Sequence, residues 1–74
     1  MNIVQDGRLN GAFEGFRDRD TVFEFQGGGV WQQNEYRYHY HYAYMPSARV
    51  VYERGRYMLY VDGVTDPVEV KKVR

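Results

Sequence analysis

The chain has 74 residues, enough for one small domain and too few for a second. It has no cysteine, which excludes disulfides and thiolate metal sites, so the core must hold by packing alone. Ten Lys and Arg balance ten Asp and Glu, which argues against a strongly basic, nucleic-acid-binding surface. We expect a cytoplasmic protein, because cysteine is absent and no apolar stretch reaches the length of a signal peptide core or a membrane span.

Residue composition favours strands over helices. Val, Tyr, Phe, Thr, Ile and Trp supply 26 residues, against three Ala and two Leu. No strand is predicted for residues 1–10, which we expect to form a flexible N-terminus. Beyond them the pattern predicts, in chain order, strands over 11–17 and 21–26, one beginning at Val30, and others over 36–45, 48–53, 56–62 and 68–70. Charged or glycine-containing segments at 17–20, 27–29, 54–55 and 62–63 supply the turns.

The segment 36–45 has the most regular pattern in the chain. Tyrosine occupies every second position over ten residues, which is the period of an extended strand. At about 3.3 Å per residue the strand would reach about 33 Å, so we expect it to bend and to serve both sides of a barrel. Pro46 is predicted to end it.

Short strands about ten residues apart predict a small antiparallel barrel of five or six strands, forming a single domain over residues 1–74. Closing the sheet removes its exposed edges and buries one face of every strand. The residues predicted to form the core are Phe13, Phe23, Phe25, Trp31, Val50, Leu59, Val61, Val68 and Val70.

The tyrosines of segment 36–45 predict an exposed aromatic row. Five rings on one side of one strand exceed what so small a core can hold, because each buries about 150 Å² or more and its hydroxyl needs a partner. The row has two functional interpretations, and a third in which it only covers the barrel. The residues predicted to line a contact surface are Trp31, Tyr36, Tyr38, His39, Tyr40, His41, Tyr42 and Tyr44.

The favoured partner of this surface is another protein, most simply a second copy of the chain, since Tyr, Trp and Arg dominate interface hot spots. The alternative is single-stranded nucleic acid, whose bases stack on aromatic rings while arginines meet phosphates. Arg37, Arg49, Arg54 and Arg56 are near the row in sequence. Because acidic residues interleave with these arginines and the net charge is zero, we favour self-association or another protein partner.

Metal binding and catalysis have weaker support. His39 and His41 form an H-x-H pair, which would place two imidazoles on one side of a strand about 7 Å apart. A divalent ion needs further ligands, and carboxylates such as Glu35 or Glu53 are the only candidates, so we expect no metal or other cofactor. Ser47 is the only serine and no nucleophile motif is present, so a non-enzymatic protein is predicted.

Several segments resemble a recurring set of small bacterial proteins and domains of unknown function. The most specific are Trp31-Gln32-Gln33 and the Tyr-His alternation ending in Met45-Pro46; residues 21–25 and 55–57 add to them. The similarity covers residues 11–73. Where an Asn-Gly turn would be usual, this chain has Gln26 and three glycines, which loosens the hairpin register. The resemblance implies an SH3-like β-barrel and a bacterial source, with relatives carried on integron gene cassettes, and it transfers no catalytic residue.

Overall fold

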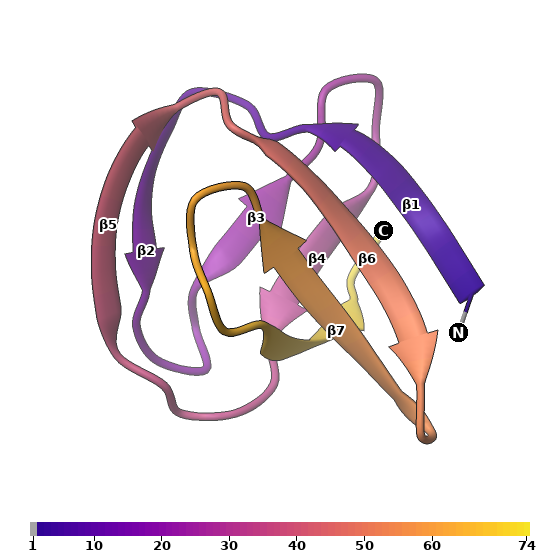
Figure 1. Cartoon of the computed structure of the whole chain (residues 1–74). Helices are drawn as coiled ribbons and strands as arrows, with labels where there is room; N and C mark the ends of the chain where they lie inside the picture. The colour runs from indigo at the N-terminus through magenta and orange to yellow at the C-terminus, as the bar shows by residue number, and fades with distance from the viewer. Residues whose placement is uncertain (1) are drawn as a thin grey trace.

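The computed structural model describes residues 2–74, which form eight strands and no helix (Figure 1). Every strand pair is antiparallel, so the all-β prediction is confirmed, with more strands than the five or six expected. Nothing in residues 2–74 has the helical length and hydropathy that crossing a membrane requires. The strands are β1 (Asn2–Arg8), β2 (Ala12–Phe16), β3 (Val22–Glu24), β4 (Val30–Gln33), β5 (His39–Tyr44), β6 (Ser47–Glu53), β7 (Arg56–Val61) and β8 (Val68–Lys72).

Six strands form one sheet in the order β1-β6-β7-β8-β4-β3, and β2 and β5 form a second, two-stranded sheet. β6 and β7 are joined by the predicted two-residue turn. Arg54 and Gly55 have φ angles of 54° and 77°. Two consecutive positive φ values are the signature of a type I′ turn, whose twist matches that of the flanking strands. The turn sets the register that places Val50 opposite Leu59, and both are fully buried.

Two long bent strands connect the sheets. β1 leads into β2 and β5 leads into β6, while β1 pairs with β6 and β2 pairs with β5 (Figure 1). The ladder continues around the bend, because the Leu9 amide donates to Pro46 O at 3.0 Å and the Met45 amide donates to Gly11 O at 2.9 Å. Gly11 and Met45 both have positive φ, 67° and 50°, so the two chains turn together. The bend expected within segment 36–45 lies instead at its end, at Met45 and Pro46, between β5 and β6.

The strands of residues 2–74 do not close into one barrel. The two ends of the larger sheet approach each other at an isolated bridge between Leu9 and Phe25, where the Gln26 amide also donates to Arg8 O at 2.8 Å. Beyond this bridge β2 leaves to pair with β5, and a narrow groove of about 80 Å³ separates it from β3. Closure fails there because the β2 and β3 backbones form no ladder with each other.

The core prediction is confirmed, because all nine predicted residues are at most 5% exposed. Leu9, Phe16 and Ala48 complete the cluster. The Phe16 ring meets the rings of Phe13 and Phe23 edge to face, with centroids 5.8 and 5.9 Å apart. Fully burying one such apolar side chain stabilises a fold by about 1.5–3 kcal/mol.

Two segments differ from the expected strand pattern. Residues 2–8 form β1 and pair along β6, although no strand is predicted there. The long strand predicted over 36–45 begins only at His39, so Tyr36 and Tyr38 lie in an irregular segment before β5. Hydrogen bonds from the Gln33 side chain to the carbonyls of Glu35 and Arg37 hold that segment in place of a strand ladder.

Candidate interaction surface

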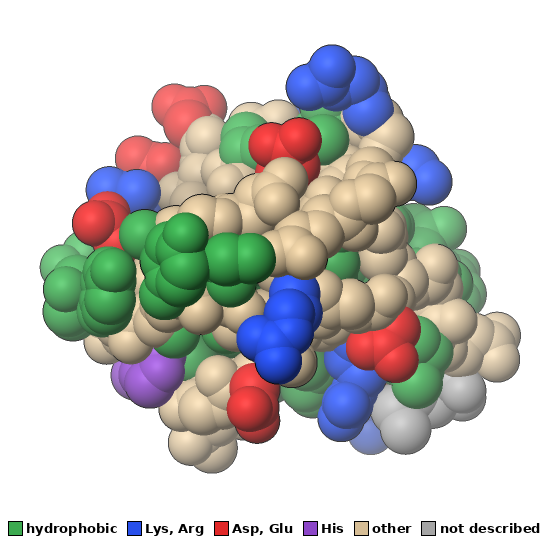
Figure 2. Space-filling model, turned by 90° about the horizontal axis from the view of Figure 1, so that it is seen from above, with side chains coloured by type: hydrophobic (Ala, Val, Ile, Leu, Met, Phe, Trp, Pro, Cys, Tyr) green, Lys and Arg blue, Asp and Glu red, His purple; other side chains and the backbone are tan. Residues whose placement is uncertain are grey.

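Five tyrosines are exposed along β5 and the segment before it. Their exposed fractions range from 57% to 72%, as expected from the size of the core. Figure 2 shows apolar side chains, tyrosines included, gathered beside a histidine on the left, the side on which β5 lies in Figure 1. We call this set the tyrosine face; its members are Tyr36, Tyr38, Tyr40, Tyr42 and Tyr44.

The strand alternation of β5 orients the rings of the tyrosine face. Ala43 packs against the core and His41 is half-buried. Because successive side chains of a strand point to opposite sides, the tyrosines at 40, 42 and 44 point to solvent. Ala12, which lies opposite Tyr44 on β2, is also exposed. The outer face of the two-stranded sheet is therefore uncovered in the described chain.

Gly15 allows β2 to lie close against β5. The register shifts between the Phe13–Ala43 and Gly15–Tyr40 pairs, which marks an extra β5 residue at a bulge. Gly15 has a φ of 102°, and a Cβ there would lie 2.8 Å from the His41 amide nitrogen and would overlap the His39 carbonyl. Only glycine fits this position without displacing β5.

Gln33 holds the segment that carries Tyr36 and Tyr38. Its side chain is fully buried, and its Oε1 accepts a hydrogen bond from the Arg17 amide at 2.9 Å. Its Nε2 lies within hydrogen-bonding distance of the carbonyls of Arg17, Glu35 and Arg37, at 3.0, 3.0 and 3.2 Å. One amide side chain therefore joins the end of β2 to the chain that leads into β5. The segment keeps a fixed backbone without belonging to a strand.

The charged groups near the tyrosine face are balanced. Arg17 lies 3.8 Å from Glu14, and Arg37 lies 3.8 Å from Glu35. The arginines at 49, 54 and 56 lie on β6, its turn and β7, and the tip of that hairpin is on the opposite side of the molecule from β5 (Figure 1). The proximity of Arg54 and Arg56 to the row in sequence is thus not kept in space, whereas Arg37 lies within the segment that carries Tyr36 and Tyr38.

Trp31 does not share the tyrosine face, which corrects its predicted place on the contact surface. Its indole is 2% exposed and its Nε1 donates to Gln5 Oε1 at 2.8 Å. The ring lies 5.3 Å from that of Tyr57, which in turn lies 4.9 Å from Tyr52. Trp31 is thus a core residue, because β1 supplies the polar partner that lets its N–H be buried.

His39 and His41 occupy different environments. His39 is exposed and lies opposite Phe16, whereas the half-buried His41 approaches the Asp62-Gly63 turn. A Cβ on Gly63 would lie 3.1 Å from His41 Nε2. Among residues 2–74 no group of three or more His, Cys, Asp or Glu side chains is arranged to hold a metal ion. His39 thus lies exposed at the start of β5, and His41 lies half-buried beside the Asp62-Gly63 turn.

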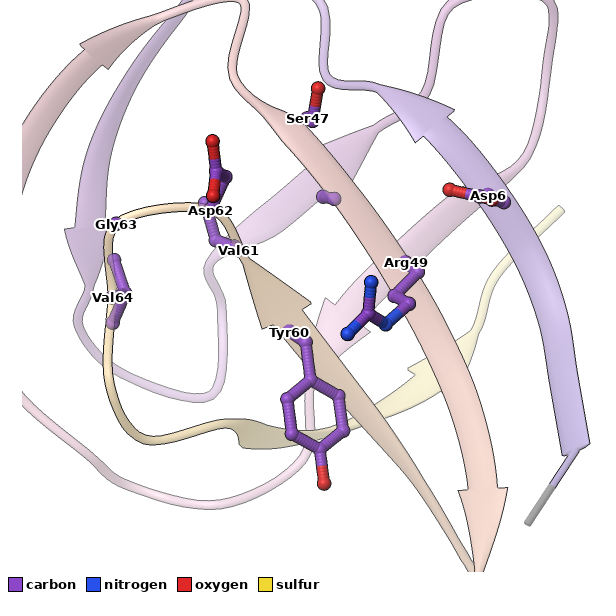
Figure 3. Close-up of a pocket in the computed structure, with 9 residues that line it drawn as sticks. Asp6, Ser47, Arg49, Tyr60, Val61, Asp62, Gly63 and Val64 are labelled. Atoms are coloured by element: carbon purple, nitrogen blue, oxygen red, sulfur yellow. The ribbon is translucent and has the colours of Figure 1, made fainter.

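A hollow of about 420 Å³ is lined by residues of β1, β6, β7 and the turn that follows β7 (Figure 3). Side chains of both charges line it, among them Asp6, Arg49 and Asp62. The Arg49 guanidinium lies 5.9 Å from the centre of the Tyr60 ring. No sequence pattern singles out this hollow, because its lining comes from three separate segments.

Tyr60 has its hydroxyl bound at the edge of that hollow. The hydroxyl lies 3.1 Å from both carboxylate oxygens of Glu53. Burial of the ring, and then the hydrogen bond to Glu53, raise the pKa of Tyr60 above its ordinary value of 10.0. Tyr60 therefore keeps its proton at neutral pH and acts as a hydrogen-bond donor.

Gln33 and Gly15 are the two positioning residues that sequence patterns did not identify. For Gln33 a signal exists. It lies two positions after Trp31 on the same strand, so its side chain points to the same buried face. For Gly15 the signal is the odd spacing of Phe13 and Phe16 on either side of it, which is typical of a bulge.

Comparison of the chain with family models, curated proteins and solved structures gives no match.

Proposed function

We propose that this protein is a non-enzymatic binding or assembly module that self-associates through the tyrosine face. The observation that carries the proposal is the exposure of five tyrosines at every second position of residues 36–44, each at least 57% accessible, in a chain of 74 residues. Large apolar surfaces left exposed on a soluble chain often mark interaction sites. Tyrosine suits a contact surface because it brings a large rigid ring and a hydroxyl that pairs at the rim.

The size of the tyrosine face supports a protein partner. At about 200 Å² for a complete aromatic side chain, the exposed parts of the five rings amount to roughly 600 Å². A stable protein interface buries about 800 Å² on each partner. The rings alone therefore supply most of one partner's share, and Ala12 and Glu14 on the same sheet face can supply more.

The charges favour a protein over single-stranded nucleic acid. A nucleic-acid groove combines stacking rings with free cations along the backbone path. Here two arginines beside the face, Arg17 and Arg37, each have a carboxylate within 4 Å, and the Arg8 guanidinium donates to Met45 O. Such a surface is close to neutral and would lack the counterion release that drives nucleic-acid binding.

We also infer that the fold is a variant of the SH3-like barrel, as the sequence resemblance implies. The near closure at Leu9 and Phe25, the strand pair that bends from one sheet into the other, and the short turn at Arg54-Gly55 support this inference. Barrels of this type bury one face of every strand and use exposed faces and loops for contacts. A binding role fits such a scaffold.

Sedimentation velocity over a range of protein concentrations tests the proposed function. The wild type is expected to form a species of twice the monomer mass as concentration rises. The triple variant Tyr40→Ser, Tyr42→Ser, Tyr44→Ser should stay monomeric at the same concentrations. The matched control is Tyr52→Ser, which removes a 41% exposed tyrosine on β6 and should associate like the wild type.

Two results would reject self-association through this face: a wild type that remains monomeric throughout, or a triple variant that associates as strongly as the wild type. A fluorescent single-stranded oligonucleotide tests the alternative. We expect no binding at low salt. Tight binding that weakens steeply with added salt and is lost in the triple variant would favour nucleic acid as the partner.

A further inference from the structure

The backbone of β5 has one free edge. Within residues 2–74 β5 pairs with β2 alone, and no other backbone hydrogen bond reaches residues 39–44. Figure 1 shows β5 as the outermost strand, with β2 on its inner side. An unpaired edge presents a row of N–H and C=O groups on which another strand can add.

The other sheet edges carry features that oppose strand addition. β3 has only three residues, and the segment before it contains Asp18, Arg19 and Asp20. β1 carries Asp6 and Arg8, and the carbonyl of Arg8 is already occupied by the Gln26 amide. Short strands, charges and covered ends are the usual means by which proteins protect their edges.

β5 has none of these protective features. Its sequence is HYHYAY, without Pro, Gly, Lys, Arg, Asp or Glu over six residues. Two copies brought together along this strand would therefore meet no charge from Lys, Arg, Asp or Glu, and the irregularity of the strand is confined to the bulge between Tyr40 and Ala43. β2, the other edge of the small sheet, contains Glu14 and Gly15 and faces β3 across the narrow groove. The contrast with β1, β2 and β3 identifies β5 as the edge in the described chain best suited to a second copy.

We propose that β5 pairs antiparallel with β5 of a second copy about a two-fold axis, giving a four-stranded sheet in the order β2-β5-β5-β2. This inference rests on the proposed function and specifies its geometry. A two-fold axis that makes the strands antiparallel must run perpendicular to the sheet, so the tyrosine faces of the two copies lie on the same side. The joined face then carries ten tyrosines: rings that meet across the seam pack side by side and edge hydrogen bonds add to these contacts, while the outward surface of the face stays open.

The two-fold axis of the β5–β5 pair limits which residues can lie opposite each other. Because directly opposite residues of an antiparallel pair share a face, one β5 residue must lie opposite its own copy. Its Cα would be about 4.5–5.5 Å from that of the copy, which is within disulfide range. A residue two positions away would be about 14 Å from its own copy, at about 3.4 Å per residue, and could not form a disulfide.

The absence of cysteine allows a direct test. Six single-cysteine variants are made at positions 39–44, one for each β5 residue, with Tyr52→Cys on β6 as an exposed control. Each variant is checked for the wild-type circular dichroism spectrum, oxidised mildly at a concentration where the wild type dimerises, and run on a non-reducing gel. We expect one β5 position to cross-link at least about tenfold faster than those two residues away, and the control to remain monomeric.

The test separates the two proposals. If the wild type dimerises in the centrifuge but the six positions cross-link equally or not at all, the strand pairing is wrong while association through the tyrosine face stands. If the wild type does not dimerise, both proposals are wrong. A single dominant β5 position supports the two-fold strand pair.

Discussion

The side chain of Gln33 pairs with the backbone of Arg17 in the way a neighbouring strand would. Oε1 accepts from the Arg17 amide at 2.9 Å, and Nε2 donates to the Arg17 carbonyl at 3.0 Å. The same Nε2 reaches the carbonyls of Glu35 and Arg37. The segment carrying Tyr36 and Tyr38 is thus fixed by one buried amide, and the part of the tyrosine face that precedes β5 depends on it.

Replacing Gln33 by leucine should lower the free energy of unfolding by about 2 kcal/mol or more. Each buried backbone group left without a partner costs about 1–3 kcal/mol, and the substitution leaves several. Urea denaturation followed by circular dichroism gives the value. The matched control is Gln32→Leu, which removes one exposed hydrogen bond to Arg19 O and should cost far less. Equal losses in the two variants would contradict the role assigned to Gln33.

Gly15→Ala should destabilise the β2–β5 sheet. The added Cβ would overlap the His39 carbonyl, and the positive φ of 102° is unfavourable for alanine, so we expect a loss of about 1–3 kcal/mol. The control is Gly27→Ala, which also has positive φ, 90°, but has open space around its Cβ. Amide hydrogen exchange should speed up in β5 for Gly15→Ala only. Unchanged exchange in β5 would show that the close approach at Gly15 is not needed.

The core was predictable from the sequence because its residues alternate with polar ones inside strands bounded by clear turns. The exposure of the tyrosines was predictable from volume, since five rings could not fit inside. β1 was not predictable, because Ile3 and Val4 are both exposed and the strand has no buried face to impose an alternation. Trp31 was expected both in the core and on the contact surface; its burial confirms the first and overturns the second, and the polar partner of its indole, Gln5, lies on this unpredicted strand.

Arg54→Asn should raise the free energy of unfolding by about 0.5–1 kcal/mol. Arg54 occupies the first central position of a type I′ turn with a φ of 54°, a conformation that asparagine adopts more readily. The reverse effect is expected for Gly55→Ala, because φ is 77° there and alanine is strained. Thermal or urea unfolding of both variants checks the pair. A loss of stability in Arg54→Asn would mean that the arginine side chain contributes more than its strained backbone costs.

Tyr60 should make stability fall at high pH. Its pKa is raised in the folded state by burial and by Glu53, so its contribution is complete below the unfolded value near 10 and is lost as pH rises through the folded value. Tyrosinate absorbance should show a tyrosine that titrates above pH 10. That late titration should disappear in Tyr60→Phe and move to lower pH in Glu53→Gln. A Tyr60→Phe protein with an unchanged absorbance profile would contradict the assignment.

The most direct test of the central claim is a nuclear magnetic resonance dilution series that follows each backbone amide as protein concentration rises. If the tyrosine face is the contact, amides of residues 36–44 should shift and broaden together, while those at the Arg54-Gly55 turn stay unchanged. Residues 36–44 that remain constant at every concentration, or changes confined to the β6–β7 hairpin, would contradict it.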